Sequence, residues 1–525
     1  MTRTRASLLV SLAVSLGLSG CGGGGSGGGG NGSGWVAGVF SPANTFQALC
    51  AAPRRGTDPI SGRPYPDRKG STLTENNWLR SWSNDLYLWY NEITDQDPSK
   101  YSTTAYFDLL KTMATTPSGK AKDRFHFTMA TSDWEQLAQS GVAPGYGATW
   151  SIVAASPPRQ IVVAYTDPGT PATNLSPPLL RGATVLKVDG VDAVNATGQT
   201  AVDALNAGLF PAQVNEAHTF TVRDPGAATN RDVTMTSVDV TSTPVQNVKV
   251  IPIGAERVGY MLFNDHLATA EQELIDAVNQ LNAAPGIDDL VLDIRYNGGG
   301  YLDIASELAY MIAGSAQASG KTFETTTFNN KHPTTDPVTG DPLTPLSFHS
   351  TSQGFSTPAG QALPTLDLPR VFVLTGSNTC SASESIINSL EGINVEVIQI
   401  GSTTCGKPYG FYPQDNCGTT YFSVEFQGKN AQGFGDYPDG FSPANTLNNV
   451  GAVNTGCSVG DDYGHALGDP LEGRLAAALQ YRQSTTCPFP PSGRVPPGAA
   501  TQSSGEPLDG VVRKPEWLQN RILRR

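Results

Sequence analysis

Two residues in the segment 370–411 have side chains suited to acyl-transfer chemistry, Ser381 and Lys407. A serine hydroxyl attacks an acyl carbon when a neighbouring base accepts its proton, and lysine is the base in one recurrent arrangement. An ordinary lysine, with a pKa of about 10.4, is protonated at neutral pH and cannot accept that proton. Burial lowers the pKa of a lysine, and no carboxylate lies between Lys407 and Asp415. The pair therefore predicts a buried Lys407 whose pKa is lowered by about three, at a cost of roughly 4 kcal/mol.

A βαβ unit is expected to bring these two residues together, although they lie far apart in the sequence. Residues 371–374 and 395–400 are apolar runs typical of strands buried on both faces. Between them, apolar residues at helical spacing are followed by Gly392, which suits the end of a helix. Strands joined in this way lie parallel and connect right-handedly. The ends that carry Ser381 and Lys407 should therefore meet at one edge of the sheet.

Two motifs in this half of the chain resemble the active-site signatures of a known peptidase family. Residues 381–384 read Ser-Ala-Ser-Glu and residues 406–407 read Gly-Lys. A second motif, at residues 293–300, reads Asp-Ile-Arg-Tyr-Asn-Gly-Gly-Gly. Both are similar to those of the carboxyl-terminal processing peptidases (tail-specific proteases), which are serine peptidases with a Ser–Lys dyad. Gly298 stands where that family commonly has a proline.

The resemblance implies roles for five residues of these motifs. Ser381 is the expected nucleophile, Lys407 the general base and Glu384 a third catalytic residue. On chemical grounds, Glu384 either orients Lys407 or caps the helix. The oxyanion hole is expected to combine the N–H of Ala382, at the start of the helix, with an N–H of the glycine run. The resemblance implies that Gly299 is the second donor, and the chemistry needs no cofactor.

Other functions compete with this one. A catalytically silent, PDZ-bearing lipoprotein that binds peptides would not need both Ser381 and Lys407. Acyl-CoA chemistry is a further alternative because the peptidase core of this family resembles the crotonase fold. A Ser–His–Asp hydrolase would require one of the six histidines, and no G-x-S-x-G motif surrounds Ser381. The histidines are His126, His218, His266, His332, His349 and His465.

The first residues are typical of an exported lipoprotein. A basic start, an apolar run at residues 6–18 and the sequence Leu-Ser-Gly before Cys21 describe a secretory signal that resembles the bacterial lipobox. Lipidation of Cys21 would anchor the chain in the cell envelope, facing the periplasm or the cell exterior. Residues 22–34 are almost entirely Gly and Ser, which suits a flexible tether.

Composition excludes some partners and leaves the disulfides open. The net charge is −13 and no dense basic run is present, so nucleic acid is not an expected partner. Six further cysteines in an exported chain favour disulfides, and their spacings match no zinc pattern, so no metal is predicted. Either a Cys405–Cys417 or a Cys380–Cys405 bridge would hold the loop that carries Lys407. The six are Cys50, Cys380, Cys405, Cys417, Cys457 and Cys487.

Two segments before the catalytic core differ in character. Residues 76–137 show helical spacing of Trp, Leu and Tyr, and we interpret them as a packing cap without chemistry. Residues 141–240 contain short strand patterns and turns whose order resembles a PDZ domain. The glycine loop of such a domain offers N–H groups to the carboxylate of a peptide. Gly145, Tyr146 and Gly147 are the expected peptide-binding residues.

The predicted fold class is α/β, with a ClpP/crotonase-like peptidase core, an N-terminal helical segment and an inserted PDZ-like domain. Within the core, residues 321–366 are predicted to be an insertion, residues 421–426 one half-buried strand and residues 471–481 a closing helix. The predicted parts are a signal peptide and lipobox at 1–21, a tether and linker at 22–70, the helical segment at 71–140, the PDZ-like domain at 141–242, the Ser–Lys peptidase core at 243–485 and a Pro-rich, basic tail at 486–525.

The predicted function is that of a lipid-anchored serine endopeptidase. Its substrates would be exported proteins or peptides with free C-termini, cleaved near those termini through the Ser–Lys dyad. The membrane would be contacted only through the N-terminal lipid.

Overall fold

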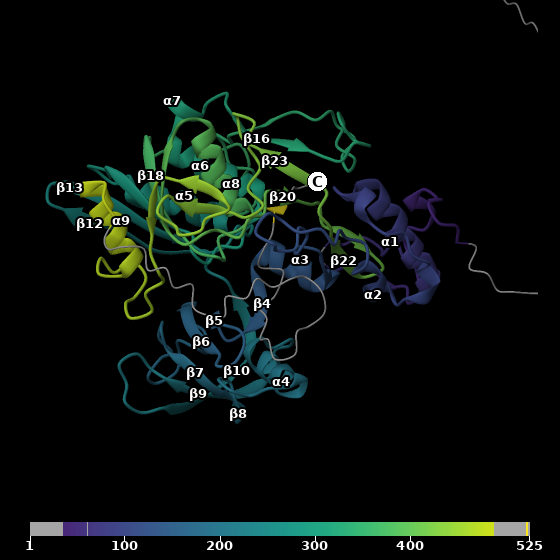
Figure 1. Ribbon diagram of the computed structural model, residues 1–525, viewed down its shortest axis with the longest axis horizontal. Coiled ribbons are helices and arrows are strands. Elements are labelled where there is room, and N and C mark those ends of the chain that lie inside the picture. The colour runs from purple at the N-terminus through teal and green to yellow at the C-terminus, as the bar shows by residue number, and fades with distance from the viewer. Residues whose placement is uncertain (1–34, 60, 488–520, 523–525) are drawn as a thin grey trace, which may run out of the picture.

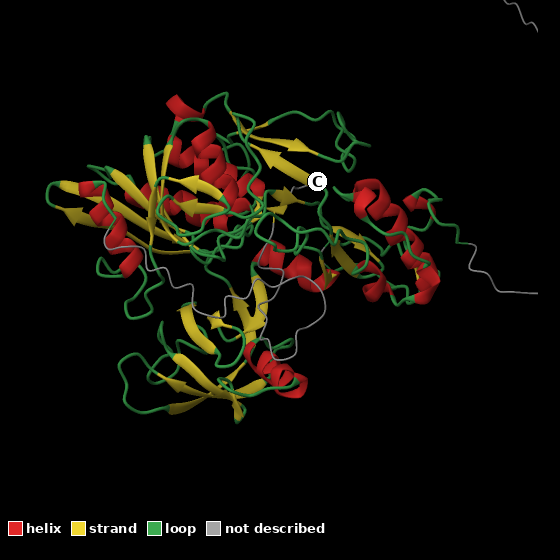
Figure 2. Cartoon of the chain, viewed as in Figure 1, coloured by secondary structure: helices red, strands yellow, loops and turns green. Residues whose placement is uncertain are grey.

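The computed structural model describes residues 35–59, 61–487 and 521–522, so the predicted signal and Cys21 lie outside it (Figure 1). Helices and strands alternate through the larger body, which is a mixed α/β structure (Figure 2). Its central sheet has the strand order β12-β13-β14-β18-β19-β26, parallel except for β12. The strands are β12 (Val245–Ile253), β13 (Glu256–Phe263), β14 (Asp289–Asp293), β18 (Arg370–Thr375), β19 (Glu396–Gly401) and β26 (Gly456–Ser458).

Helices cover both faces of this sheet. Val371 and Val373 point into the core shared with α5 (Ala270–Leu281), α6 (Leu302–Ala313) and α8 (Ala382–Gly392). Phe372 and Leu374 point the opposite way, into the core shared with α9 (Gly473–Ser484). A strand covered on both faces needs apolar residues at every position, which explains the uninterrupted apolar run. The predicted βαβ unit is confirmed as β18, α8 and the parallel β19, and α8 ends at Gly392.

A smaller β-rich body lies at the bottom of Figure 1. Its main sheet has the order β10-β9-β7-β6-β5, with β8 paired to β7, and β4 pairs with β11. Trp150, Val163 and Phe220 belong to an apolar core of its own. The elements are β4 (Val142–Gly145), β5 (Ala148–Ala154), β6 (Gln160–Thr166), β7 (Thr184–Val188), β8 (Val191–Asp192), α4 (Gln199–Leu209), β9 (Ala217–Arg223), β10 (Arg231–Thr236) and β11 (Val238–Thr241).

The N-terminal segment is less helical than its sequence predicts. It contains α1 (Thr72–Leu86), α2 (Thr103–Phe107) and α3 (Thr131–Ser140), but β3 (Phe127–Ala130) is a strand. This strand pairs with β22 (Thr419–Phe422) of the core, and Phe127 stacks on Phe422 with ring centroids 4.2 Å apart. A partner distant in sequence therefore overrides the local helical pattern.

Residues 421–426 do not form the single strand that their alternation predicts. β22 ends at Phe422, and a separate strand, β23 (Phe426–Lys429), joins a different sheet with the order β17-β16-β23-β20. The break coincides with contacts to other segments, because the Val424 carbonyl accepts the Leu88 N–H at 2.8 Å. The predicted insertion supplies two strands of that sheet, β16 (Thr322–Thr327) and β17 (Leu346–Ser347).

Three disulfides join cysteines of the described residues: Cys50–Cys417, Cys380–Cys405 and Cys457–Cys487. Of the two pairings predicted for the loop of Lys407, Cys380–Cys405 is confirmed and Cys405–Cys417 is wrong. Cys417 lies instead in the turn between β21 (Gln414–Asn416) and β22, where it meets Cys50 from the N-terminal segment.

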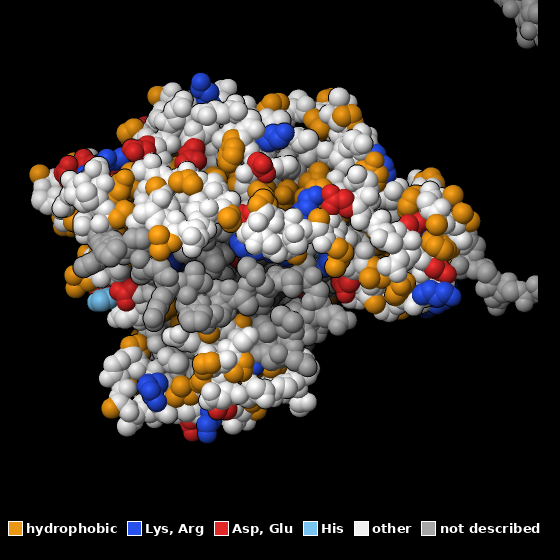
Figure 3. All heavy atoms as spheres, in the orientation of Figure 1, with side chains coloured by type: hydrophobic (Ala, Val, Ile, Leu, Met, Phe, Trp, Pro, Cys, Tyr) orange, Lys and Arg blue, Asp and Glu red, His pale blue; other side chains and the backbone are white. Residues whose placement is uncertain are grey.

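Charged side chains are scattered over the face shown in Figure 3, without one basic or acidic patch. Within residues 35–59, 61–487 and 521–522, no helix has the length and apolarity needed to cross a bilayer.

Candidate active site

Ser381 lies at the sharp turn between β18 and α8. Its φ of 60° and ψ of −117° are rare for a residue other than glycine, and such strain costs about 1–3 kcal/mol. Two hydrogen bonds hold the turn: the Ser381 N–H donates to Glu384 Oε2 at 2.9 Å, and the Cys380 N–H donates to the Asn297 carbonyl at 3.0 Å. The Ser381 side chain is fully buried, and its Oγ makes no hydrogen bond to any described residue. A strained, buried hydroxyl of this kind favours a functional role.

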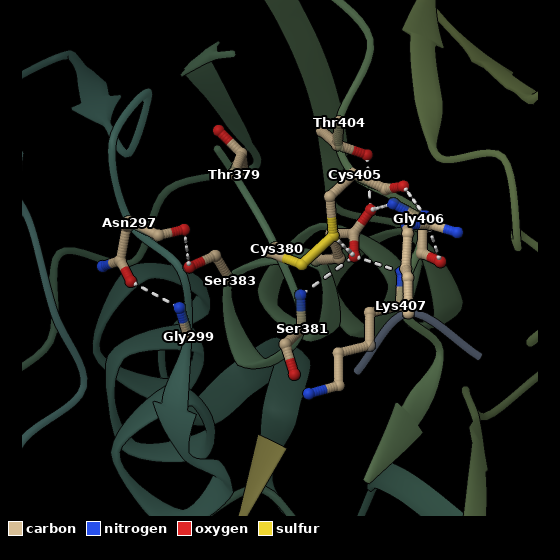
Figure 4. Close-up of a disulfide and its surroundings, with 12 residues drawn as sticks. Asn297, Gly299, Thr379, Cys380, Ser381, Ser383, Thr404, Cys405, Gly406 and Lys407 are labelled. Atoms are coloured by element: carbon tan, nitrogen blue, oxygen red, sulfur yellow. Dashed lines mark hydrogen bonds between the residues drawn. A yellow bond between two sulfur atoms is a disulfide. The ribbon is translucent and has the colours of Figure 1, made fainter. Parts of the chain in front are cut away.

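Lys407 lies in an aromatic pocket, and its side chain points toward that of Ser381 (Figure 4). Its Nζ is 4.9 Å from the ring centroid of Phe125 and 4.6 Å from that of Phe411. Phe125 precedes β3 and Phe411 follows β20 (Tyr409–Gly410), so the pocket combines segments from distant parts of the chain. The βαβ unit supplies Ser381, and the loop after β19 supplies Lys407.

Burial lowers the pKa of Lys407 to about 7. The carboxylates of Asp123 and Glu384 oppose this lowering because they favour the charged ammonium, whereas the Arg124 guanidinium adds to it. The loss of hydration on burial outweighs both the carboxylates and the nearby rings. A lysine with this pKa is about half neutral at pH 7 and can accept a proton from a serine.

Glu384 joins the backbones of the two predicted catalytic residues. Its Oε2 accepts the N–H of Ser381 at 2.9 Å and the N–H of Lys407 at 2.8 Å. Its Oε1 accepts the Gly406 N–H at 2.8 Å and the Thr404 hydroxyl at 2.5 Å. Burial raises the pKa of Glu384, and these donors oppose that rise. Glu384 therefore caps the start of α8 and also positions Lys407, through its backbone.

The two predicted oxyanion donors, the N–H groups of Ala382 and Gly299, differ in their hydrogen bonding. Ala382 is the first residue of α8, so its N–H has no carbonyl partner within the helix. The Gly299 N–H donates to Asn297 Oδ1 at 2.9 Å and is engaged in this structure. An Asn side chain often accepts from the N–H two residues on, so the sequence Asn-Gly-Gly could have predicted this bond. His266 adds a second donor to Asn297 Oδ1, from Nδ1 at 3.0 Å.

The first residues of the glycine motif have a structural role. The Arg295 guanidinium is fully buried and donates to Asp293 at 2.9 Å and to both oxygens of Glu472 at 2.7 and 2.9 Å. Glu472 is the N-cap of α9, and Tyr260 donates to Asp293 at 2.7 Å. This network fixes the end of β14, from which the chain turns into Asn297 and the glycines.

The N-terminal segment contributes to the lysine pocket, contrary to the predicted role as a cap without chemistry. Arg124 donates to the carbonyls of Cys405 and Gly406, which lie beside Lys407. Asp123 is buried, accepts a hydrogen bond from Tyr87 at 2.7 Å and is the strongest of the charges that raise the pKa of Lys407. In the sequence, the adjacent Asp-Arg-Phe follows Lys120 and Lys122, so its charges alone do not mark this role.

All six histidines lie within the described residues, and none of them hydrogen-bonds Ser381. His266 is the one nearest the glycine motif, where its ring bonds Asn297 and burial lowers its pKa to about 3. The other five make their side-chain bonds elsewhere: His126 to Phe107, His218 to Asp189, His332 to Asp85, His349 to Asp303 and His465 to Asp462.

Two groups of metal-type side chains occur in the described part of the chain, and each contains a disulfide. One combines Glu384 with Cys380 and Cys405, and the other combines Glu75 with Cys50 and Cys417. Thiolates are the usual ligands from cysteine, and a disulfide offers none.

The predicted peptide-binding residues of the smaller body lie at the turn between β4 and β5. The Tyr146 side chain is buried against Phe220, and its hydroxyl donates to the Gly208 carbonyl at 3.0 Å. A side chain at Gly147 would collide with Thr170. Tyr146 therefore stabilises the body's own core, and any peptide contact at Gly145, Tyr146 or Gly147 would involve the backbone.

Comparison with known proteins gives one family. Residues 257–411 match the model of peptidase family S41. A carboxyl-terminal-processing protease from Picosynechococcus sp. is 33% identical over 125 residues, which are 24% of this chain and 28% of that protein. The chain thus matches little more than a quarter of the length of this curated relative.

Two solved structures align with longer stretches of the chain. An S41 protease from Bacteroides fragilis aligns over 80% of this chain and 98% of its own, with a TM-score of 0.56 and 21% identity. A photosystem II D1 C-terminal processing protease aligns over 72% of this chain and 92% of its own, with a TM-score of 0.42 and 18% identity. The first of these likenesses supports a shared fold.

Proposed function

We propose that this protein is a serine-type peptidase in which Ser381 is the nucleophile and Lys407 the general base. The observation that carries the proposal is the burial of Lys407, which lowers its pKa to about 7 while its side chain points toward a buried, strained serine. The match of residues 257–411 to the model of peptidase family S41 supports the same chemistry.

In the proposed reaction, neutral Lys407 takes the proton of the Ser381 hydroxyl as its oxygen attacks the substrate carbonyl carbon. The Ala382 N–H stabilises the resulting oxyanion, and the Gly299 N–H does so once it leaves Asn297 Oδ1. The lysine then gives its proton to the leaving amine, and an acyl-serine remains. A water molecule, deprotonated by Lys407, hydrolyses this ester and restores the serine.

The remaining parts of the proposal concern substrate and location. We place cleavage near the C-termini of exported proteins or peptides, as the name of the Picosynechococcus relative suggests. The core is proposed to be ClpP/crotonase-like and the body at residues 142–241 PDZ-like, with a role in holding peptides. A lipid on Cys21 would keep the enzyme at the membrane of the cell envelope, facing the periplasm or exterior.

Hydrolysis of an unstructured peptide by four purified proteins tests the dyad. Ser381→Ala and Lys407→Ala should lose activity to a similar extent, because residues that act as a unit are not additive. Lys321→Ala removes an exposed lysine and should behave as the wild type. Substantial activity in Lys407→Ala would overturn the dyad and favour a histidine as the general base.

Two further measurements test the substrate and the anchor. A peptide with a free C-terminal carboxylate should be cleaved faster than the same peptide with an amidated end, and equal rates would contradict processing from C-termini. Cys21→Ser should release the protein from the membrane fraction while its activity on peptides persists. Retention of this variant after a carbonate wash would contradict the lipid anchor.

A further inference from the structure

The segment at β27 (Arg521–Ile522) is paired with the strand that follows the oxyanion glycine. β27 runs parallel to β15 (Gly300–Tyr301), with Arg521 opposite Gly300 and Ile522 opposite Tyr301. Figure 1 shows it as a short yellow arrow near β20, far from the position of α9. A peptide that adds to a strand in this way is held by main-chain bonds, which is a common mode of peptide recognition.

The other side of β27 meets the lysine loop. Ile522 forms a parallel bridge with Phe411, whose ring centroid is 4.6 Å from Lys407 Nζ. β27 thus lies between the strand that follows Gly299 and the residue that covers the predicted base. In the view of Figure 4, a strand in the yellow of the chain's end lies below Ser381.

The Ile522 side chain is 3% exposed and packs into an apolar pocket. The pocket combines residues of the N-terminal segment with residues of the core. A charged side chain at this position would lose its hydration without gaining a partner. The lining residues are Phe127, Trp134, Leu137, Leu267, Phe411 and Phe422.

We propose that this pocket and the edge of β15 form the peptide-binding groove of the active site, and that the chain's own segment at Ile522 occupies it as an uncleaved, inhibitory strand. The inference rests on the proposed peptidase function. Strand pairing with β15 holds the segment, and the apolar pocket selects its isoleucine. A substrate has to displace the strand before its carbonyl group reaches Ser381.

The first test compares full-length proteins on an unstructured peptide. Ile522→Asp should raise kcat/KM about tenfold if the strand fills the groove nine-tenths of the time, mainly through a lower KM, since only the open state binds substrate. Leu471→Asp is the matched control, because Leu471 is 71% exposed and remote from the strand in sequence. Equal kcat/KM values for Ile522→Asp and the wild type would overturn the proposal.

The second test adds the strand as a separate peptide and measures inhibition of the Ile522→Asp protein itself. A synthetic peptide with the sequence of residues 513–525 should inhibit the Ile522→Asp protein competitively, and the same peptide carrying Ile522→Asp should not. Mass spectrometry should find the added peptide and the wild-type tail intact. Loss of residues beyond 521 from the wild type but not from Ser381→Ala would overturn the proposal, because the segment would then be a substrate.

A binding measurement separates this inference from the proposed function. If no variant hydrolyses any peptide, the proposed peptidase function is contradicted. Fluorescence anisotropy then tests whether the groove still binds the peptide. The protein for this measurement carries both Ser381→Ala and Ile522→Asp. It should bind the labelled wild-type peptide of residues 513–525 more tightly than the labelled peptide that carries Ile522→Asp. Equal binding of the two peptides would overturn the groove.

Discussion

Ser381 and Lys407 donate their backbone N–H groups to the same oxygen atom, Oε2 of Glu384, at 2.9 and 2.8 Å. One carboxylate oxygen therefore sets how far apart the two backbones lie. The N-cap of α8 and the loop after β19 are joined here without any contribution from the two reacting side chains.

Glu384→Gln should lower kcat about a hundredfold with little change in KM. The amide group can present only one oxygen, so an NH₂ group would face at least one of the N–H donors, and the alignment of Ser381 with Lys407 would be lost. Glu391→Gln makes the same change at the other end of α8 and should leave kcat near that of the wild type. An unchanged kcat in Glu384→Gln would contradict the positioning role.

The dependence of kcat/KM on pH should follow the protonation of Lys407. Because the base must be neutral, kcat/KM should rise with pH through about 7. Asp123 favours the charged lysine, so Asp123→Asn should move this ascending limb to lower pH. Asp133→Asn, an exposed change on α3, should leave the limb in place. A shift of the limb to higher pH in Asp123→Asn would contradict the assignment of the base.

Lys407→Met should stabilise the protein while it abolishes activity. The folded pKa of about 7 lies below the unfolded value of 10.5, so the unfolded chain binds more protons between these values. The wild type therefore gains stability as pH rises from about 7 to 10.5, by roughly 5 kcal/mol at most. The variant should unfold at higher urea than the wild type at pH 7, and the difference should shrink toward pH 10.5. A constant difference across this range would show that packing, not the charge, is responsible.

The Cys380–Cys405 disulfide should matter for activity as well as for stability. It spans 25 residues and Cys457–Cys487 spans 30, so removing either should cost a similar amount, about 3–4 kcal/mol on a chain-entropy account. Replacing both cysteines of the first pair by alanine should also lower kcat, because Cys380 precedes Ser381. The second double variant should keep kcat at a temperature where both proteins are folded. Equal kcat values in the two double variants would contradict a role for the first disulfide in the site.

The parts of the fold that sequence reasoning predicted well are those decided by short-range pattern. The apolar run at residues 371–374, the helix that ends at Gly392 and the next apolar run form one unit, in which β18 and β19 pair in parallel as predicted. The same reasoning brought Ser381 and Lys407 to one edge of the sheet. Their side chains point toward each other in the structure (Figure 4).

The parts that it missed depend on partners far away in the chain. Residues 127–130 form a strand because β22 pairs with them, and the alternation at 421–426 is broken by contacts with the N-terminal segment. Phe125 reaches Lys407 across more than half of the sequence, and no periodicity marks it. The insertion of Ile522 into an apolar pocket likewise has no local signature, since its neighbours in the sequence are mostly polar or basic.

The pocket of Lys407 has walls from both halves of the polypeptide, Phe125 on one side and Phe411 on the other. A ribosome completes the first wall long before the second. Until Phe411 has been synthesised and packed against the earlier segment, Lys407 is solvated and remains protonated at neutral pH. A nascent chain that does not yet contain Phe411 therefore carries a serine without a neutral base, and the proposed peptidase stays inactive until that residue has been added.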